Sequence, residues 1–83
     1  RKETEFIFEV NQNFDYSLDI YSIGGRRIWT SKGYSLNAGI NTIKWNGKNA
    51  FGEEISNGVY IYRIKIFGEE TTITHIGRCA RYR

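Results

Sequence analysis

The segment Trp45–Ile66, WNGKNAFGEEISNGVYIYRIKI, decides the fold of this chain. Trp45 closes an apolar run, and Asn46-Gly47 interrupts that run, because both residue types tolerate positive φ in tight turns. Gly58 then opens the run VYIYRIKI, whose β-branched and aromatic residues favour a half-buried strand. The segment therefore predicts the end of one strand, an ordered loop and a long second strand.

The spacing W-N-G-x4-G-x5-G-V-Y within this segment is a folding motif and contains no reaction motif. We expect Asn46 to bond backbone amides downstream of it, and Phe51 or Ile55 to close one end of the core. Six residues are predicted to have structural roles: Trp45, Asn46, Gly47, Gly52, Gly58 and Tyr60.

The rest of the chain alternates in the same way. Phe6, Phe8 and Val10 share one face of a predicted strand, and Asp19 is expected on the outer face of the next one. Strands are predicted at residues 4–10, 16–23, 26–31, 40–45, 59–67 and 71–78. With no helical period among them, they favour an all-β, immunoglobulin-like antiparallel sandwich of six to seven strands.

Glycines and polar residues separate these strands. Gly24-Gly25 predicts a tight hairpin with a primed turn. The segment Lys32–Asn37 is expected to be a polar connection, and Gly77 to interrupt the last strand. In the strand after Gly58, one face is apolar and the other mixed, which favours a central position in the sheet.

Length and charge restrict the classes of protein that fit. The 83 residues form one domain, and the net charge of +3 comes from the C-terminal end, where Arg78, Arg81 and Arg83 follow the last acidic residue. A basic end of this kind does not predict nucleic-acid binding, which needs a basic stripe on one face. The chain has no run of 18 or more apolar residues, so no transmembrane segment is predicted.

No catalytic site or cofactor is predicted. His75 and Cys79 are the only histidine and cysteine, and at this spacing on a strand they lie about 13 Å apart, too far for proton transfer. A single cysteine also allows no internal disulfide. Calcium ligands could come from Asn46, Asn49, Glu53 and Glu54, although solvated loop charges are the favoured interpretation.

Two surface hypotheses remain open. Tyr21, Trp29 and Tyr34 could form a polysaccharide-binding platform, although cross-strand packing is the favoured interpretation. The basic residues Arg63, Lys65, Arg78 and Arg81 could form a recognition surface. The basic end, with Arg78, Arg81 and Arg83, could contact a membrane, an anionic polysaccharide or a partner protein. For the basic end itself, a solvated terminus is favoured.

The motifs resemble the immunoglobulin-like domain of the flagellar hook-capping protein and the related C-terminal sorting domains of the type IX secretion system. The resemblance rests on the hairpin LDIYSIGGRRI (18–28), on Ala38-Gly39, on IKWNG (43–47) and on NGVY (57–60), and it covers nearly the whole chain. The family usually has Asp where Asn46 stands here, and both side chains can cap the loop.

This resemblance implies a non-catalytic module, secreted or at the cell surface, and compatible with an accessory role beside a secreted peptidase or glycoside hydrolase. Residues 1–83 are interpreted as a single sandwich domain, the C-terminal module of a larger exported bacterial protein. It would act as a sorting and attachment domain recognised by the secretion machinery through its last strands, or as a spacer between neighbouring domains. The alternatives are a carbohydrate-binding module and an assembly domain of a surface structure such as a hook cap.

Overall fold

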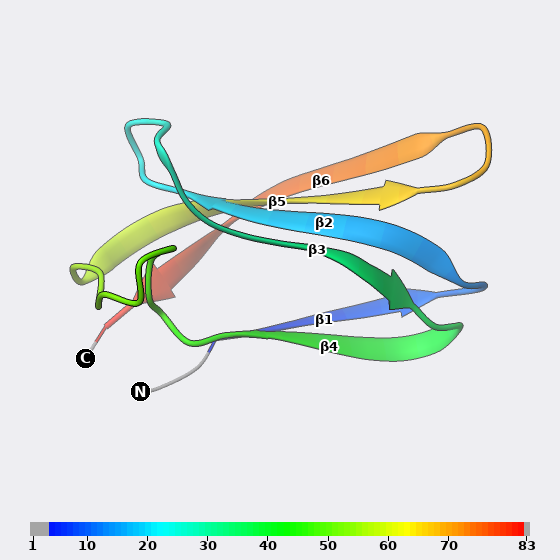
Figure 1. Cartoon of the computed structure of the whole chain (residues 1–83), viewed down its shortest axis with the longest axis horizontal. Helices are drawn as coiled ribbons and strands as arrows, with labels where there is room; N and C mark the ends of the chain where they lie inside the picture. The colour runs from blue at the N-terminus through cyan, green and yellow to red at the C-terminus, as the bar shows by residue number, and fades with distance from the viewer. Residues whose placement is uncertain (1–3, 83) are drawn as a thin grey trace.

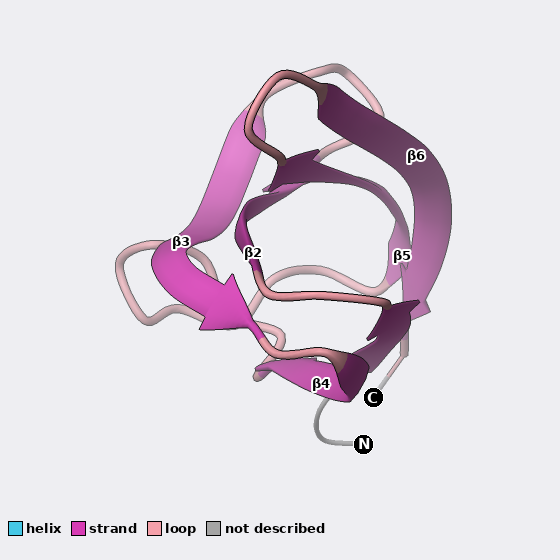
Figure 2. Ribbon diagram, turned by 90° about the vertical axis from the view of Figure 1, so that its right-hand side faces the viewer, coloured by secondary structure: helices cyan, strands magenta, loops and turns pink. Residues whose placement is uncertain are grey.

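Two antiparallel sheets face each other in the structure (Figures 1 and 2). The computed structural model describes residues 4–82, and the side chains of all of these except residues 32–34. The smaller sheet pairs β1 (Thr4–Val10) with β4 (Gly39–Trp45). The larger sheet has the order β3 (Arg27–Leu36), β2 (Phe14–Tyr21), β5 (Gly58–Phe67) and β6 (Thr72–Arg81). The all-β sandwich predicted from the sequence is confirmed, with six strands in residues 4–82.

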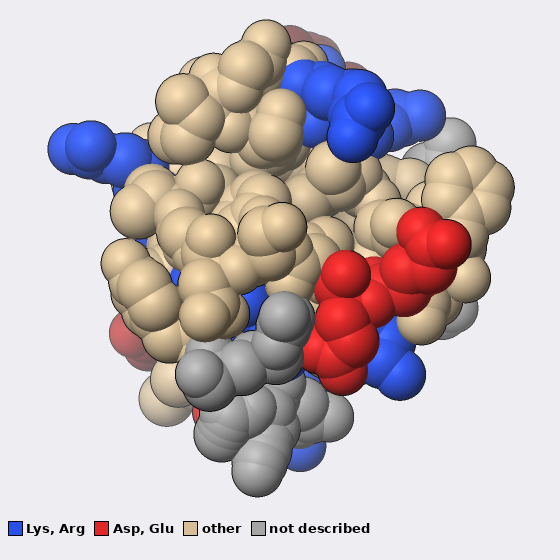
Figure 3. All heavy atoms as spheres, turned by 90° about the vertical axis from the view of Figure 1, so that its left-hand side faces the viewer, with Lys and Arg blue, Asp and Glu red and all other residues tan. Residues whose placement is uncertain are grey.

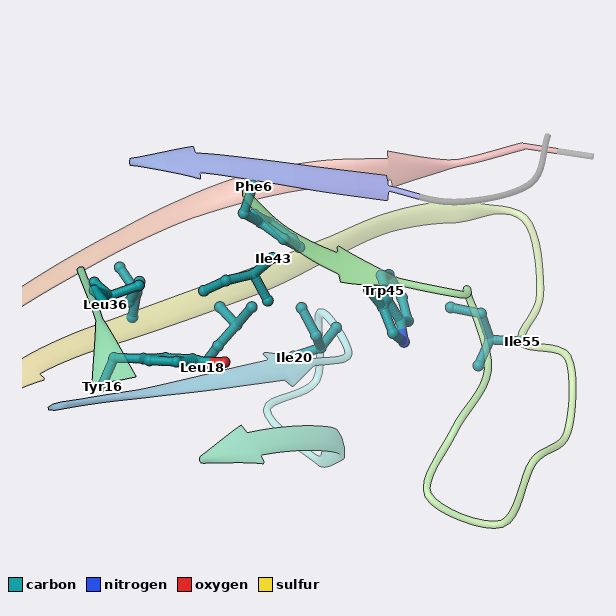
Figure 4. Close-up of a cluster of buried hydrophobic side chains, with 9 residues drawn as sticks. Phe6, Tyr16, Leu18, Ile20, Leu36, Ile43, Trp45 and Ile55 are labelled. Carbon is teal, nitrogen blue, oxygen red and sulfur yellow. The ribbon is translucent and has the colours of Figure 1, made fainter. Parts of the chain in front are cut away.

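The core fills the space between the two sheets (Figure 4). Leu18, Ile20 and Ile64 from the larger sheet are almost completely buried against Phe6 and Ile43 from the smaller one. Each strand contributes alternate residues, as the pleat requires. Phe8 and Val10 pack at the margin of this cluster, on the face predicted for them.

The β2–β3 hairpin differs from the predicted primed turn. Ser22 accepts a bond from the Gly25 amide and donates its own amide to the Arg26 carbonyl, both at 2.9 Å. Within this hairpin only Gly25 has positive φ, at 95°, and it is the last residue of the turn. A primed turn would have positive φ at a central position. The geometry fits a three-residue loop with glycine in the left-handed position, a common hairpin connection.

β3 continues through the segment predicted to be a polar connection, so that prediction was wrong. Tyr16 pairs with Tyr34 and Ser17 pairs with Lys32, which leaves Gly33 as the extra residue of a β-bulge. The bulge lets the strand resume pairing, and Leu36 then enters the core with 2% of its surface exposed. A polar composition therefore concealed a strand that is irregular but continuous.

β6 likewise runs through Gly77, which we had expected to interrupt it. Gly77 pairs with Tyr62 on β5, and a Cβ atom at Gly77 would lie 2.5 Å from the Tyr62 hydroxyl oxygen. The tyrosine side chain therefore occupies the space that a side chain on β6 would need. An aromatic ring laid over a cross-strand glycine is a recognised way of covering an exposed strand backbone.

Replacing Gly77 with alanine should therefore destabilise the domain by about 1–3 kcal/mol, because the tyrosine must move or distort the strand. Gly24→Ala is the matched control, since the nearest atom to a Cβ there is the Ser22 hydroxyl oxygen at 3.9 Å. Urea denaturation measures both effects. Equal stabilities of the two variants would contradict the packing of Tyr62 over Gly77.

Candidate functional site

The loop that follows β4 is organised by Trp45. Its indole is fully buried, lies 6.1 Å from the Trp29 ring and 6.3 Å from the Tyr60 ring between centroids, and donates Nε1–H to the Lys48 carbonyl at 2.9 Å. The apolar body of the side chain thus packs in the core while its one polar group fixes the first turn of the loop. The Tyr60 hydroxyl donates to the Ser56 carbonyl at 2.7 Å and fixes the other end.

Two asparagines hold the loop together from inside. The Asn46 side-chain oxygen accepts the Lys48 amide at 3.0 Å, as predicted. Asn49, whose role the sequence did not reveal, accepts the amides of Phe51 and Glu53 and donates its side-chain amide to the Glu53 carboxylate. These contacts engage the side-chain oxygens of Asn46 and Asn49 and one carboxylate oxygen of Glu53, three of the four residues considered as calcium ligands. Residues 4–82 contain no group of three or more His, Cys, Asp or Glu side chains placed to hold a metal ion.

Ile55 closes the end of the core, whereas Phe51 does not. Ile55 retains 8% exposure and belongs to the buried cluster, as Figure 4 shows, but Phe51 is 86% exposed. Of the two residues predicted for this role, the structure therefore selects Ile55. The Ala50 amide also donates to the Ile28 carbonyl at 2.9 Å, which ties the loop to β3.

Arg81 at the end of β6 lies against this loop and is not part of a solvated terminus. Only 6% of its surface is exposed, and its Nη2 donates to the Asn46 carbonyl at 3.3 Å. A Cβ atom at Gly47 would overlap the Arg81 guanidinium, so the glycine of the W-N-G motif provides the space for it. The Arg81 Nε is buried and has no hydrogen-bond partner among the described residues.

A second cluster lies on the outer face of the larger sheet. Asp19 points to this face as predicted, yet it is only 5% exposed, because Arg63 bonds its carboxylate at 3.2 Å and Arg27 approaches it at 3.8 Å. Arg63 also donates to the Tyr21 hydroxyl at 2.6 Å, and its guanidinium carbon lies 5.3 Å from the centre of the Tyr21 ring. A cation over an aromatic face gains electrostatic attraction in addition to the ion pair.

The four basic residues predicted as a recognition surface therefore separate. Arg63, Lys65 and Arg78 lie on the outer face of β5 and β6, whereas burial removes Arg81 from the surface. Arg83 lies outside the described residues. Figure 3 shows the end of the molecule formed by the hairpin and the Trp45 loop, where acidic side chains gather in one patch and basic side chains lie mainly toward the edges of a largely uncharged surface. This end is thus not a uniformly basic patch.

The three aromatic residues proposed for polysaccharide binding are also separated. Trp29 pairs with Ile20, which points into the core, and its ring packs on Trp45, whereas Tyr21 lies on the outer face beneath Arg63. The side chain of Tyr34 lies outside the described part of the structure. The register thus supports the packing interpretation for Trp29, whose remaining surface lines a hollow of about 470 Å³ beside Phe51.

The remaining reactive side chains lie apart on β6. His75 is exposed at the sheet edge with its ring 5.8 Å from the Tyr62 ring, and Cys79 pairs with Tyr60 four residues further along. Burial raises the pKa of the Cys79 thiol above its ordinary value, which favours the unreactive protonated form. Within residues 4–82, no helix is long and apolar enough to cross a membrane.

Comparison with solved structures finds a likeness of fold. No protein-family model matches the chain, and no curated protein matches it. The structure is similar to a solved structure of FlgD from P. aeruginosa, with a TM-score of 0.76 and 14% sequence identity. The match covers 94% of this chain and 61% of the FlgD chain, so this chain spans less than two thirds of that protein's length. FlgD is the flagellar hook-capping protein, and the FlgD-like fold expected from the sequence motifs is thereby confirmed.

The contact between Arg81 and the loop predicts different costs for two equivalent glycines. Gly47 and Gly52 both have φ of 81°, so backbone strain from alanine at either position should cost the same free energy of unfolding, about 1–2 kcal/mol. Gly47→Ala should cost more in free energy of unfolding, because it also displaces Arg81, whereas a Cβ at Gly52 meets open space. In an Arg81→Ala background the two costs should become equal. Equal costs in the unmodified chain would rule out the contact.

The outer-face cluster predicts that Asp19→Asn lowers the free energy of unfolding by about 1–3 kcal/mol, because it leaves the half-buried Arg63 without its counter-charge. Asp15→Asn provides the control: its carboxylate is exposed and accepts one bond from Ser35 at 3.2 Å. That change should stay within about 0.5 kcal/mol. Thermal or urea denaturation distinguishes the two variants. If Asp19→Asn leaves the free energy of unfolding unchanged, the ion pair contributes nothing to stability.

Proposed function

We propose that this chain is a non-catalytic structural module of an exported bacterial protein and that it takes part in assembling a structure at the cell surface. The observation that carries the proposal is the fold likeness to FlgD over 94% of the chain. The chain would contribute protein-binding surface to its parent protein, and its partners would be neighbouring domains and other subunits of the assembly.

The use of the motif residues supports this function. Trp45, Asn46, Gly47 and Tyr60 are occupied in closing the loop, and Arg81 is occupied in covering it. Asp19, Arg63 and Tyr21 satisfy one another on the sheet face. The polar and aromatic side chains of the loop and of this cluster therefore stabilise the fold, and the exposed residues of the two sheets are available for binding a partner.

A type IX sorting domain is the second candidate, and β6 is the feature that favours it. β6 is an edge strand of the larger sheet, and residues 71–76 are exposed along it. A secretion apparatus that recognises the last strands of a folded sandwich would find this edge accessible, because unpaired strand edges can be extended by another chain.

The two candidates differ in the fate of the domain after export. Surface structures sheared from cells of the native host would be separated from the medium, and both fractions analysed with an antibody against the domain and by intact mass. An assembly module should be found in the sheared fraction with residues 1–83 retained. Mature protein that lacks residues 1–83 would overturn the assembly function in favour of a cleaved sorting domain. Absence of the parent protein, with or without this domain, from both the sheared fraction and the medium would contradict both.

A further inference from the structure

The outer face of the smaller sheet alternates isoleucine with glutamate. Ile7 and Ile40 are 64% and 75% exposed, and they are diagonal neighbours, because Ile7 pairs with Thr42 and Ile40 pairs with Glu9. Glu5 continues the same face of β1 and is paired with Lys44. The negative charge therefore concentrates at the Glu9 end, beside the two exposed isoleucines.

The outer face of the larger sheet has the same arrangement with the opposite charge. Ile61 pairs with Arg78, and Ile76 pairs with Arg63, so these two isoleucines are also diagonal neighbours with basic residues beside them. Ile76 is 62% exposed. Lys65 follows on the same face of β5. Asp19 offsets the charge of Arg63, which leaves Arg78 and Lys65 as the cations without an ion-pair partner among the described residues on this part of the face.

We propose that the Ile–Glu face of one copy binds the Ile–Arg face of a second copy of this chain. The diagonal isoleucines would pack together, because isolated apolar side chains gain from removal from water. Glu9, which is paired with Ile40, would meet Arg78, which is paired with Ile61, and this contact fixes the register of the two faces. Lys65 lies further along β5 and adds to the positive potential that steers the two faces together. This inference builds on the proposed assembly function by naming a second copy as the partner.

The placement of the two faces determines the kind of assembly. They are the outer surfaces of opposite sheets of the sandwich, so each copy can bind one neighbour through each face (Figure 2). Such a head-to-tail contact does not close on itself as a twofold dimer does, and it generates a row or a ring.

The test uses two variants, each altered on one face. E5K/E9K reverses the acidic face, and K65E/R78E reverses the basic face while keeping Arg63 for Asp19. E69K/E70K is the matched control, because it makes the same charge change as E5K/E9K at the exposed turn before β6. Sedimentation velocity would be measured over a range of concentrations in about 0.02 M and about 0.5 M salt, where screening differs strongly.

The unmodified chain and the control should grow in mass with concentration at low salt and lose this growth at high salt. Each face variant alone should be monomeric. Their equimolar mixture should regain the growth in mass, because the unchanged faces of the two variants pair with each other and their reversed faces are again opposite in charge. A monomeric unmodified chain at low salt, a mixture that stays monomeric, or a face variant that still dimerises alone would each overturn the proposal.

These outcomes are independent of the test of the proposed function. A chain that is monomeric in solution but present in the sheared surface fraction would overturn the stacking of copies and leave the assembly function intact. A chain that stacks in solution but is absent from that fraction would overturn the assembly function and leave the stacking of copies intact.

Discussion

The fully buried indole of Trp45 is the contact on which the rest of the structure depends. It comes from the end of the smaller sheet and packs against aromatic residues of the larger one, so it joins the two layers at one end of the core. Its Nε1–H also holds the Lys48 carbonyl, which sets the path of the loop between β4 and β5. One side chain therefore links the two sheets and orders the loop that connects them. In a domain of this size the core is small, so few other residues could replace that contribution.

The sequence was sufficient for the architecture because the strands carry a clear alternation. Phe6, Leu18, Ile20 and Ile64 all point where their period of two places them. It was insufficient where the strand signal and the turn signal overlap. Gly33 and Gly77 both suggested breaks, yet one is the extra residue of a bulge and the other is covered by Tyr62. Both outcomes depend on the residue opposite the glycine, and pairing partners are not available from the local sequence.

The candidate site was predicted less well, for a related reason. The roles of the W-N-G motif followed from local turn chemistry, which acts over a few residues, and Asn46 behaves accordingly. The role of Arg81 did not, because its acceptor at Asn46 is 35 positions away in the chain. Asp19 likewise looked like an ordinary exposed carboxylate until the register brought Arg63 beside it. The role of a charged residue on a strand depends on its neighbours across the sheet. The sequence shows which charged residues are present but not which of them are paired.

The seating of Arg81 on Gly47 has a consequence for how the chain folds during synthesis. β6 ends at Arg81, which covers the turn after β4. The rest of β6 pairs with β5, and β5 in turn pairs with β2. This end of the core therefore cannot be covered until Arg81 has been synthesised and can reach Gly47, by which time almost the whole described chain has been made. Contacts between distant parts of a chain form slowly, because loop closure must precede them. Until then Trp45 and its aromatic neighbours stay accessible to chaperones.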